Sequence, residues 1–132
     1  MALANGCFDV LHVGHVRLLA EARRHCDVLV VALNSDESTR ASKGPSRPLV
    51  PLAERLEVVA ALAGVDYATS FAEPTADALI RALRPDLLVK GTDRRPEDVP
   101  ERETLAACGG RVLICGDAKT HSSSDLIRRL GG

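Results

Sequence analysis

The sequence predicts an α/β fold in which helices cover both faces of a parallel sheet. Short apolar runs alternate along the chain with segments whose apolar residues recur at helical spacing. This alternation is typical of parallel strands joined by right-handed crossovers. The apolar residues are chiefly Ala, Val and Leu, with two Phe, one Tyr and no Trp, which suits helices packed on a sheet. A chain of 132 residues has the length of one domain, so residues 1–132 are expected to form one.

The elements are expected in the following order from the N-terminus. Strands are expected at 1–4, 28–33, 67–71, 87–89 and 111–115. Helical segments are expected at 15–24, 37–41, 51–62 and 73–83, before residue 108, and from 122 to 130. The run at 28–33 is apolar throughout, as in a central strand buried on both faces. Residues 42–51 form the longest irregular stretch, and the charged segment 94–103 is expected at the surface.

Two histidines lie where the first strand gives way to the first helix. His12 is expected in the connecting loop and His15 at or near the first helical turn, with Gly14 between them. A helix N-terminus offers unpaired N–H groups and the positive end of a dipole, which suits phosphate, and Gly14 removes a side chain where a ligand approaches the backbone. These residues indicate a polyphosphate site. The alternatives are a metal site, which lacks a third ligand nearby, and ordinary polar loop residues.

Polar residues also follow the second and fourth expected strands. Asn34 and Asp36 stand after the second strand, where ligands collect in open α/β sheets, although Asp36 equally suits the cap of a short helix. Lys90 and Gly91 stand after the fourth strand, where they suit an anionic ligand or form a plain turn.

The irregular stretch at 42–51 contains two cations, Lys43 and Arg47, and no acid. Such a loop is either solvated or able to close over a polyphosphate. Near the C-terminus, Ser122, Ser123 and Ser124 open a helix, which is explained by capping and also suits a second phosphate contact.

The chain resembles the cytidylyltransferase-like nucleotidyltransferases. The resemblance begins with Asn5-Gly-Cys-Phe-Asp9 running into His12-Val-Gly-His15. Further matching stretches follow in the same order at 30–36, 43–48, 52–55, 65–67, 85–93 and 122–124. They are similar to one branch in particular, the heptose 1-phosphate adenylyltransferases, known also as the nucleotidyltransferase domain of bifunctional ADP-heptose synthases. One departure is Thr120-His121, where relatives have Gly followed by an apolar residue or Cys.

The resemblance implies a Rossmann-like sheet of five strands in the order 3-2-1-4-5. It also implies transfer of AMP from ATP to a sugar 1-phosphate, giving ADP-heptose and pyrophosphate, with Mg²⁺ bound through the substrate phosphates rather than by protein ligands. His12, His15 and Lys90 are the implied catalytic residues. The implied nucleotide-binding residues are Gly6, Cys7, Phe8, Asp9, Gly14, Lys43, Arg47, Arg55, Ser122, Ser123 and Ser124. The implied acceptor-binding residues are Asn34, Asp36, Lys90, Gly91 and Asp93.

The composition of the chain limits the kinds of partner that it is expected to bind. A formal net charge of −1 and few aromatic residues leave no basic surface or stacking platform for nucleic acid. No apolar stretch approaches the length of a membrane span, so a cytoplasmic protein without membrane contact is expected. The family resemblance adds a homodimer and a separate sugar-phosphate kinase upstream. Two other functions stay open: a cytidylyltransferase acting on an alcohol phosphate such as glycerol 3-phosphate, and a non-catalytic nucleotide-binding module.

Overall fold

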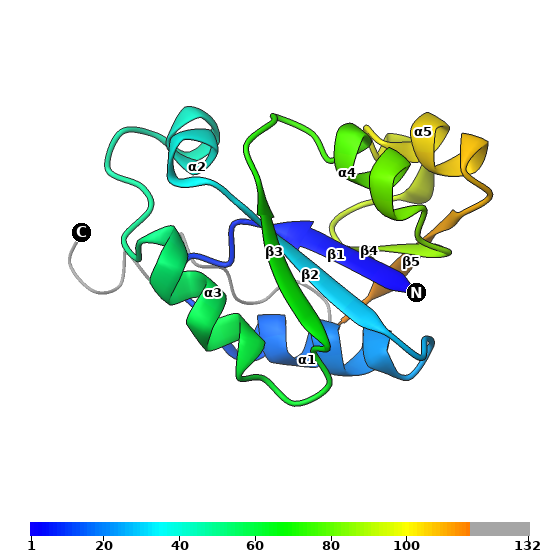
Figure 1. Ribbon diagram of the computed structural model, residues 1–132, viewed down its shortest axis with the longest axis horizontal. Coiled ribbons are helices and arrows are strands. Elements are labelled where there is room, and N and C mark those ends of the chain that lie inside the picture. The colour runs from blue at the N-terminus through cyan, green and yellow to red at the C-terminus, as the bar shows by residue number, and fades with distance from the viewer. Residues whose placement is uncertain (117–132) are drawn as a thin grey trace.

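The chain folds around a parallel sheet of five strands in the order β3-β2-β1-β4-β5 (Figure 1), which confirms the predicted order. The computed structural model describes residues 1–116. The strands are β1 (Ala2–Gly6), β2 (Leu29–Asn34), β3 (Tyr67–Phe71), β4 (Leu87–Gly91) and β5 (Arg111–Cys115). The helices are α1 (Val13–Arg23), α2 (Asp36–Lys43), α3 (Leu52–Ala60), α4 (Asp77–Leu83), the 3₁₀ turn η1 (Pro96–Asp98) and α5 (Arg102–Ala107).

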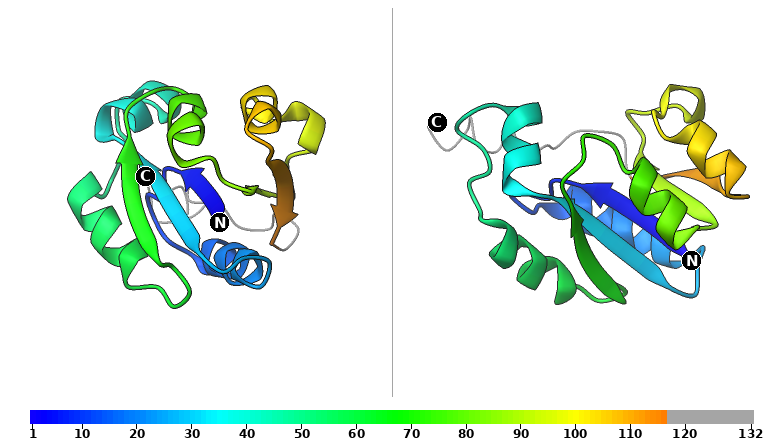
Figure 2. Two further views of the ribbon diagram at one scale, coloured as in Figure 1. Left: turned by 45° about the vertical axis from the view of Figure 1, so that its right-hand side comes forward. Right: turned by 45° about the horizontal axis from the view of Figure 1, so that its top comes forward.

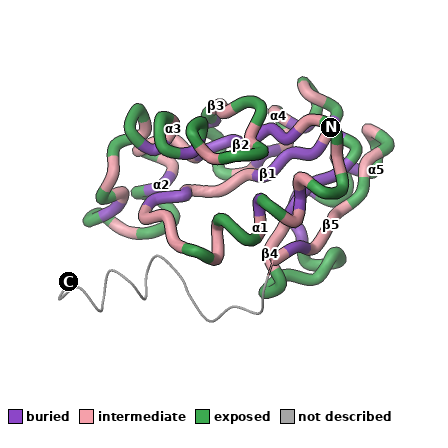
Figure 3. The backbone as a smooth tube through the Cα atoms, turned by 90° about the horizontal axis from the view of Figure 1, so that it is seen from below, coloured by how far each residue is buried: buried purple, intermediate pink, exposed green. Residues whose placement is uncertain are grey.

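Two apolar clusters cover the two faces of the sheet, and this confirms the predicted layers. Ala2 and Ala4 of β1 face a cluster that includes Leu19 of α1 and Val59 of α3. Leu3 faces the opposite cluster, to which α4 and α5 contribute. Figure 2 shows α1 and α3 on one side of the sheet and α4 and α5 on the other, and Figure 3 shows buried backbone along the central strands.

Several boundaries differ from the predicted ones. The fourth strand continues through Lys90 and Gly91, which pair with β5, so Lys90 lies in the strand rather than after it. Helix α4 begins at Asp77 rather than at residue 73. The segment 94–103 is not wholly at the surface, because Val99 and Glu101 are buried. None of the helices formed by residues 1–116 is long and apolar enough to cross a membrane.

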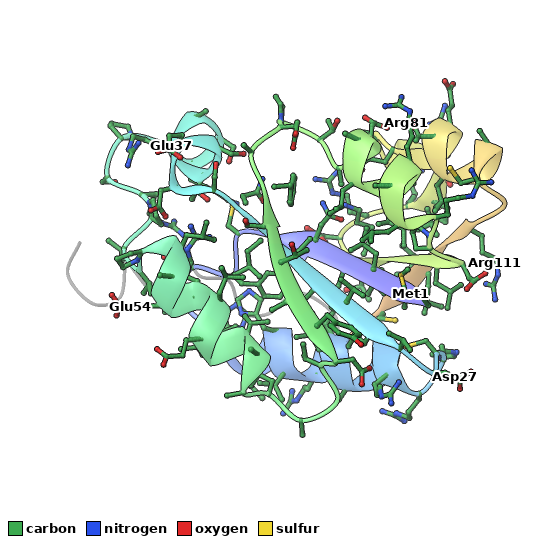
Figure 4. The ribbon with its side chains drawn as sticks, viewed as in Figure 1. Met1, Asp27, Glu37, Glu54, Arg81 and Arg111 are labelled. Atoms are coloured by element: carbon green, nitrogen blue, oxygen red, sulfur yellow. The ribbon has the colours of Figure 1, made fainter. Side chains whose placement is uncertain are left out.

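The carboxyl ends of the five parallel strands share one edge of the sheet, and α2 lies beyond this edge. Figure 4 shows Glu37 of α2 at the end of the molecule opposite to Met1 and Asp27, which precede β1 and β2. The loops that leave β1, β2 and β4 therefore meet at this edge, as expected for a ligand site in an open α/β sheet.

Candidate active site

Two adjoining cavities of about 280 and 730 Å³ lie at the carboxyl edge of the sheet. Their walls include the ends of β1 and β4, and β2 contributes to the larger cavity. The residues that line both are Asn5, Gly6, Cys7, Phe8, His12, His15, Lys43, Lys90 and Arg94. The structure thus brings both histidines, together with Lys90, into the wall that the two cavities share.

The smaller cavity is rich in cations. Besides the shared Lys43, Lys90 and Arg94, its wall includes Arg17 of α1, and the one carboxylate that residues 1–116 contribute to it is Asp93. A concave wall with more positive than negative side chains favours a polyanion.

The larger cavity differs from the smaller one in having more hydroxyl and amide groups in its wall. Its wall adds hydroxyl and amide groups from Asn34, Ser38, Ser42 and Thr75. It also contains carboxylates, Glu101 among them. Groups that both donate and accept hydrogen bonds suit a small ligand with several hydroxyl groups.

The two histidines cap helix α1 reciprocally. His12 is the N-cap, and its Nδ1 accepts a hydrogen bond from the backbone N–H of Gly14 at 3.0 Å. His15 Nδ1 accepts from the backbone N–H of His12 at 3.2 Å. These N–H groups were expected to be available to a phosphate, and the imidazoles take them instead. The rings lie 4.0 Å apart between centroids.

This capping sets the tautomer of both rings. A neutral imidazole that accepts at Nδ1 carries its proton on Nε2. His12 and His15 both accept at Nδ1, so each has an N–H donor on the side of the ring away from the backbone it caps. Both residues line both cavities.

The absence of a side chain at Gly14 leaves room for the His12 ring. A Cβ at this position would lie 2.7 Å from His12 Cε1 and 2.9 Å from Nδ1. These distances are shorter than any real side chain tolerates, so a larger residue would displace the ring. Gly14 also lines the smaller cavity, so the close approach of a ligand expected there stays a prediction.

Asp9 anchors the loop that follows α2. Its carboxylate accepts from Arg47 Nε at 2.6 Å and from the backbone N–H groups of Leu49 and Val50 at 3.0 Å. Burial by itself would raise the pKa of Asp9, but these hydrogen bonds and the charge of Arg47 outweigh burial and hold the pKa below its usual 3.8. Asp9 thus fixes a loop whose Arg47 lines the larger cavity.

Arg55 occupies a different place from the expected one. Its side chain is fully buried and donates to the carbonyl oxygens of Cys7, Asn34 and Val50 at 2.8–2.9 Å. It also donates to the Asp36 carboxylate at 2.7 Å. Within residues 1–116, the walls of the two cavities include neither Arg55 nor Asp36. This pair joins the ends of β1 and β2 to α2 and α3.

Lys90 is largely buried in the shared wall. Its Nζ donates to Asn5 Oδ1 at 3.2 Å and lies 3.7 Å from Glu101 Oε1. Burial lowers the pKa of Lys90 below its usual 10.5, the negative charge of Glu101 opposes this, and the positive charge of Arg94 adds to it. The sequence predicted a role for Lys90 but not for Asn5, Arg94 or Glu101.

The remaining predicted residues lie in the smaller cavity, in the larger cavity or outside the described residues. Gly91 and Asp93 line the smaller cavity, and Asn34 lines the larger one. Cys7 contacts Asn34, with 3.7 Å between Sγ and Oδ1. Ser122, Ser123 and Ser124 lie outside the described residues, as do Thr120 and His121. No group of three or more potential metal-binding side chains is found among residues 1–116.

Comparison with known proteins places this chain in a family. The sequence profile described as cytidylyltransferase-like matches residues 3–129. The bifunctional protein HldE of Syntrophotalea carbinolica is 48% identical over 130 residues, which cover 98% of this chain and 26% of that protein. The HldE protein of Gluconacetobacter diazotrophicus is 47% identical over 130 residues, covering 98% of this chain and 27% of that protein. The chain therefore spans about a quarter of the length of these curated relatives.

Solved structures share the fold. The lipopolysaccharide core biosynthesis protein from Thermoplasma volcanium superimposes with a TM-score of 0.75 at 24% identity, over 89% of this chain and 97% of that one. Pantothenate synthetase from Thermus thermophilus gives a TM-score of 0.62 at 15% identity, over 86% of this chain and 54% of that one. Likeness at these identities supports the fold alone.

The profile match and the curated relatives define the chain as an enzyme of the nucleotidyltransferase class, as the sequence predicted. More particularly, the chain belongs to the cytidylyltransferase-like family.

Proposed function

We propose that the protein transfers AMP from ATP to a sugar 1-phosphate, with heptose 1-phosphate as the acceptor, and releases pyrophosphate. The proposal rests chiefly on the wall between the two cavities, where two imidazole N–H donors and the Lys90 ammonium converge. The sequence resemblance to heptose 1-phosphate adenylyltransferases supplies the choice of nucleotide and sugar.

We assign the phosphates of ATP to the smaller cavity and the acceptor to the larger one. The excess of cations in the smaller cavity supports the first assignment, and the hydroxyl-rich wall of the larger cavity supports the second. An acceptor phosphate placed at the shared wall then faces the α-phosphorus of the nucleotide.

The reaction joins one phosphate oxygen of the acceptor to the α-phosphorus of ATP. The bond from that phosphorus to the oxygen of the β-phosphate breaks in line, and pyrophosphate leaves with the electron pair. His12 and His15 donate Nε2–H to the oxygens whose negative charge increases, and Lys90 holds the incoming phosphate. Positioned donors of this kind typically contribute about 10²–10³-fold each to turnover.

A divalent metal fits this site only as part of the nucleotide complex. Asp9 is already occupied by Arg47 and two backbone N–H groups, and within residues 1–116 the smaller cavity has one carboxylate, Asp93. Mg²⁺ retains several waters and binds phosphate oxygens readily, so we assign it to the phosphates of ATP, whose charge it neutralises.

Pyrophosphate release tests the proposal. ATP, CTP and GTP are each supplied with heptose 1-phosphate and with glycerol 3-phosphate, with Mg²⁺ present. The expected result is release with ATP and heptose 1-phosphate. Release only with CTP and glycerol 3-phosphate would support the cytidylyltransferase alternative. Release in none of these combinations would contradict the proposed substrates.

The His15→Glu variant tests the imidazole donor of His15 without removing the helix cap. A Glu three residues after an N-cap is able to accept from the N-cap N–H, as in a capping box, but an ionised Glu has no donor. We expect turnover to fall about 10²–10³-fold while the far-UV circular dichroism is unchanged. His25→Ala, at an exposed histidine after α1, is the matched control and should keep full turnover.

A further inference from the structure

Glu101 is a buried carboxylate beside the candidate site. It is 3% exposed and lies immediately before α5. Its Oε2 accepts from the backbone N–H of Ala76, the N-cap of α4, at 3.0 Å. Its Oε1 is buried and has no hydrogen-bond partner among the residues that the structure describes. Such an atom is unusual in a folded protein and calls for an explanation.

The charge facing Glu101 Oε1 is the Lys90 ammonium, 3.7 Å away. An uncompensated carboxylate is strongly unfavourable in a buried environment, so this pairing accounts for the position of Oε1. The contacts form a line across four segments of the chain, from Ala76 through Glu101 and Lys90 to Asn5. One end of this line is the backbone of Ala76 at the start of α4, and the other end is the side chain of Asn5 in β1, so regular elements hold both ends.

The ammonium keeps capacity for a ligand. It has three N–H donors, and its described partners are Asn5 and Glu101. Because Lys90 lines both cavities, a further donor is available to an anion at the shared wall.

We propose that Glu101 is a positioning residue for Lys90, and that it fixes the ammonium group where the phosphate of the acceptor binds. This inference rests on the proposed function for the role of Lys90. Glu101 touches the lysine rather than the reacting atoms, so it acts on catalysis through Lys90.

The charge of Glu101 also matters for the protonation of Lys90. Around the ammonium, Glu101 faces it from the start of α5, Arg94 from the segment after β4, and the neutral Asn5 from β1. Glu101 is thus the negative charge opposing both burial and Arg94. Its removal should make the ammonium lose its proton at a lower pH.

Glu101→Gln is the direct test. The Gln side-chain oxygen retains an acceptor for Ala76, while the negative charge beside Lys90 disappears. We expect kcat to fall about tenfold, because the ammonium is no longer held in place by an opposite charge, with little change in the KM for ATP. The alkaline limb of the kcat profile should move to lower pH. Glu103→Gln, at an exposed acid in the first turn of α5, is the control and should match the wild type.

NMR gives a readout that needs no substrate. The lysines of the chain are Lys43, Lys90 and Lys119, so ¹³Cε signals of labelled lysine are few and assignable with Lys90→Gln. The pKa of Lys90 should be lower in Glu101→Gln than in the wild type and unchanged in Glu103→Gln. An active wild type with the same Lys90 pKa and pH profile in Glu101→Gln would overturn the inference. Absence of turnover in the wild type would instead overturn the proposed function.

A stability comparison covers the case in which Glu101→Gln does not fold alone. Lys90→Met leaves the Glu101 carboxylate without its cation, and adding Glu101→Gln removes that charge. The double variant should therefore melt at a higher temperature than Lys90→Met. A double variant that melts lower, by the sum of two independent losses, would overturn the pairing.

Discussion

Arg55 and Lys90 are both cations near the carboxyl edge of the sheet, yet their surroundings differ in kind. Arg55 has three backbone carbonyl oxygens and the Asp36 carboxylate as acceptors, and its side chain is fully buried. Lys90 has one amide oxygen at hydrogen-bond distance and one carboxylate at 3.7 Å, and it lines two cavities. A cation whose donors are used by the protein stabilises the fold, whereas a cation with spare donors at a cavity is able to bind a ligand.

The difference predicts that Arg55→Met acts mainly on stability. The substitution leaves three buried carbonyl oxygens without their donor, so the free energy of unfolding should fall by about 3–5 kcal/mol. Urea unfolding followed by far-UV circular dichroism measures this, since the chain has no Trp for fluorescence. Arg24→Met, at an exposed arginine, should change stability little. A stable Arg55→Met protein that no longer binds nucleotide would reverse the assignment and place Arg55 at the ligand.

Lys90→Gln should act mainly on turnover and less on stability. The Gln amide is still able to donate to Asn5 and Glu101 but leaves the buried Glu101 carboxylate without its cation, so the free energy of unfolding should fall by about 2 kcal/mol, less than in Arg55→Met. Turnover should fall about 10²-fold, because the incoming phosphate loses its cation. Pyrophosphate release and urea unfolding of the same preparation measure the two effects. Nearly unchanged turnover would show that Lys90 is merely a structural cation, as Arg55 is.

The sequence predicted much of the frame that holds these two residues. The strands predicted at 67–71 and 111–115 have the observed bounds of β3 and β5, although both are edge strands of the sheet and only partly buried. The strand order followed from the family resemblance. The reciprocal capping of α1 by His12 and His15 was not predicted, since histidine is an uncommon N-cap residue.

The separate environments of Arg55 and Lys90 had no signal in the sequence. The acceptors of Arg55 are backbone carbonyls from segments up to 48 residues away, and any residue type offers such an oxygen. Glu101 lies in a charged, Pro-containing segment that is typical of a surface, and its burial depends on Ala76, 25 residues earlier. Both features arise from packing between elements rather than from local pattern.

Asp9 is a carboxylate that resembles Arg55 in this respect, because groups of the protein itself occupy its hydrogen-bonding oxygens. Its folded pKa lies below the unfolded value near 3.8, so its contribution is complete above that value and is lost as pH falls through the folded pKa. Asp9→Asn should lower the free energy of unfolding by about 2 kcal/mol at pH 7. The deficit relative to the wild type should shrink below pH 3.8. Urea unfolding between pH 7 and pH 3 measures it.

Asp27→Asn is the control for this titration, because Asp27 is exposed at the opposite end of the sheet. A deficit in Asp9→Asn that grows as the pH falls would mean that the Asp9 carboxylate is not held by Arg47 and the backbone of residues 49–50.

Gly14→Ala should have the smallest effect and tests whether the histidine cap is organised for catalysis. Ala is a better helix former than Gly by about 1 kcal/mol, which offsets part of the strain, so stability should stay within about 1 kcal/mol of the wild type. The new Cβ, however, displaces the His12 ring from its 3.0 Å contact with the Gly14 N–H, and turnover should fall about tenfold. Gly109→Ala, where a Cβ meets no atom within 4 Å but φ is +81°, is a control that strains the backbone away from the site. It should lose stability and keep turnover, whereas full turnover in Gly14→Ala would show that the ring position of His12 is unimportant for the reaction.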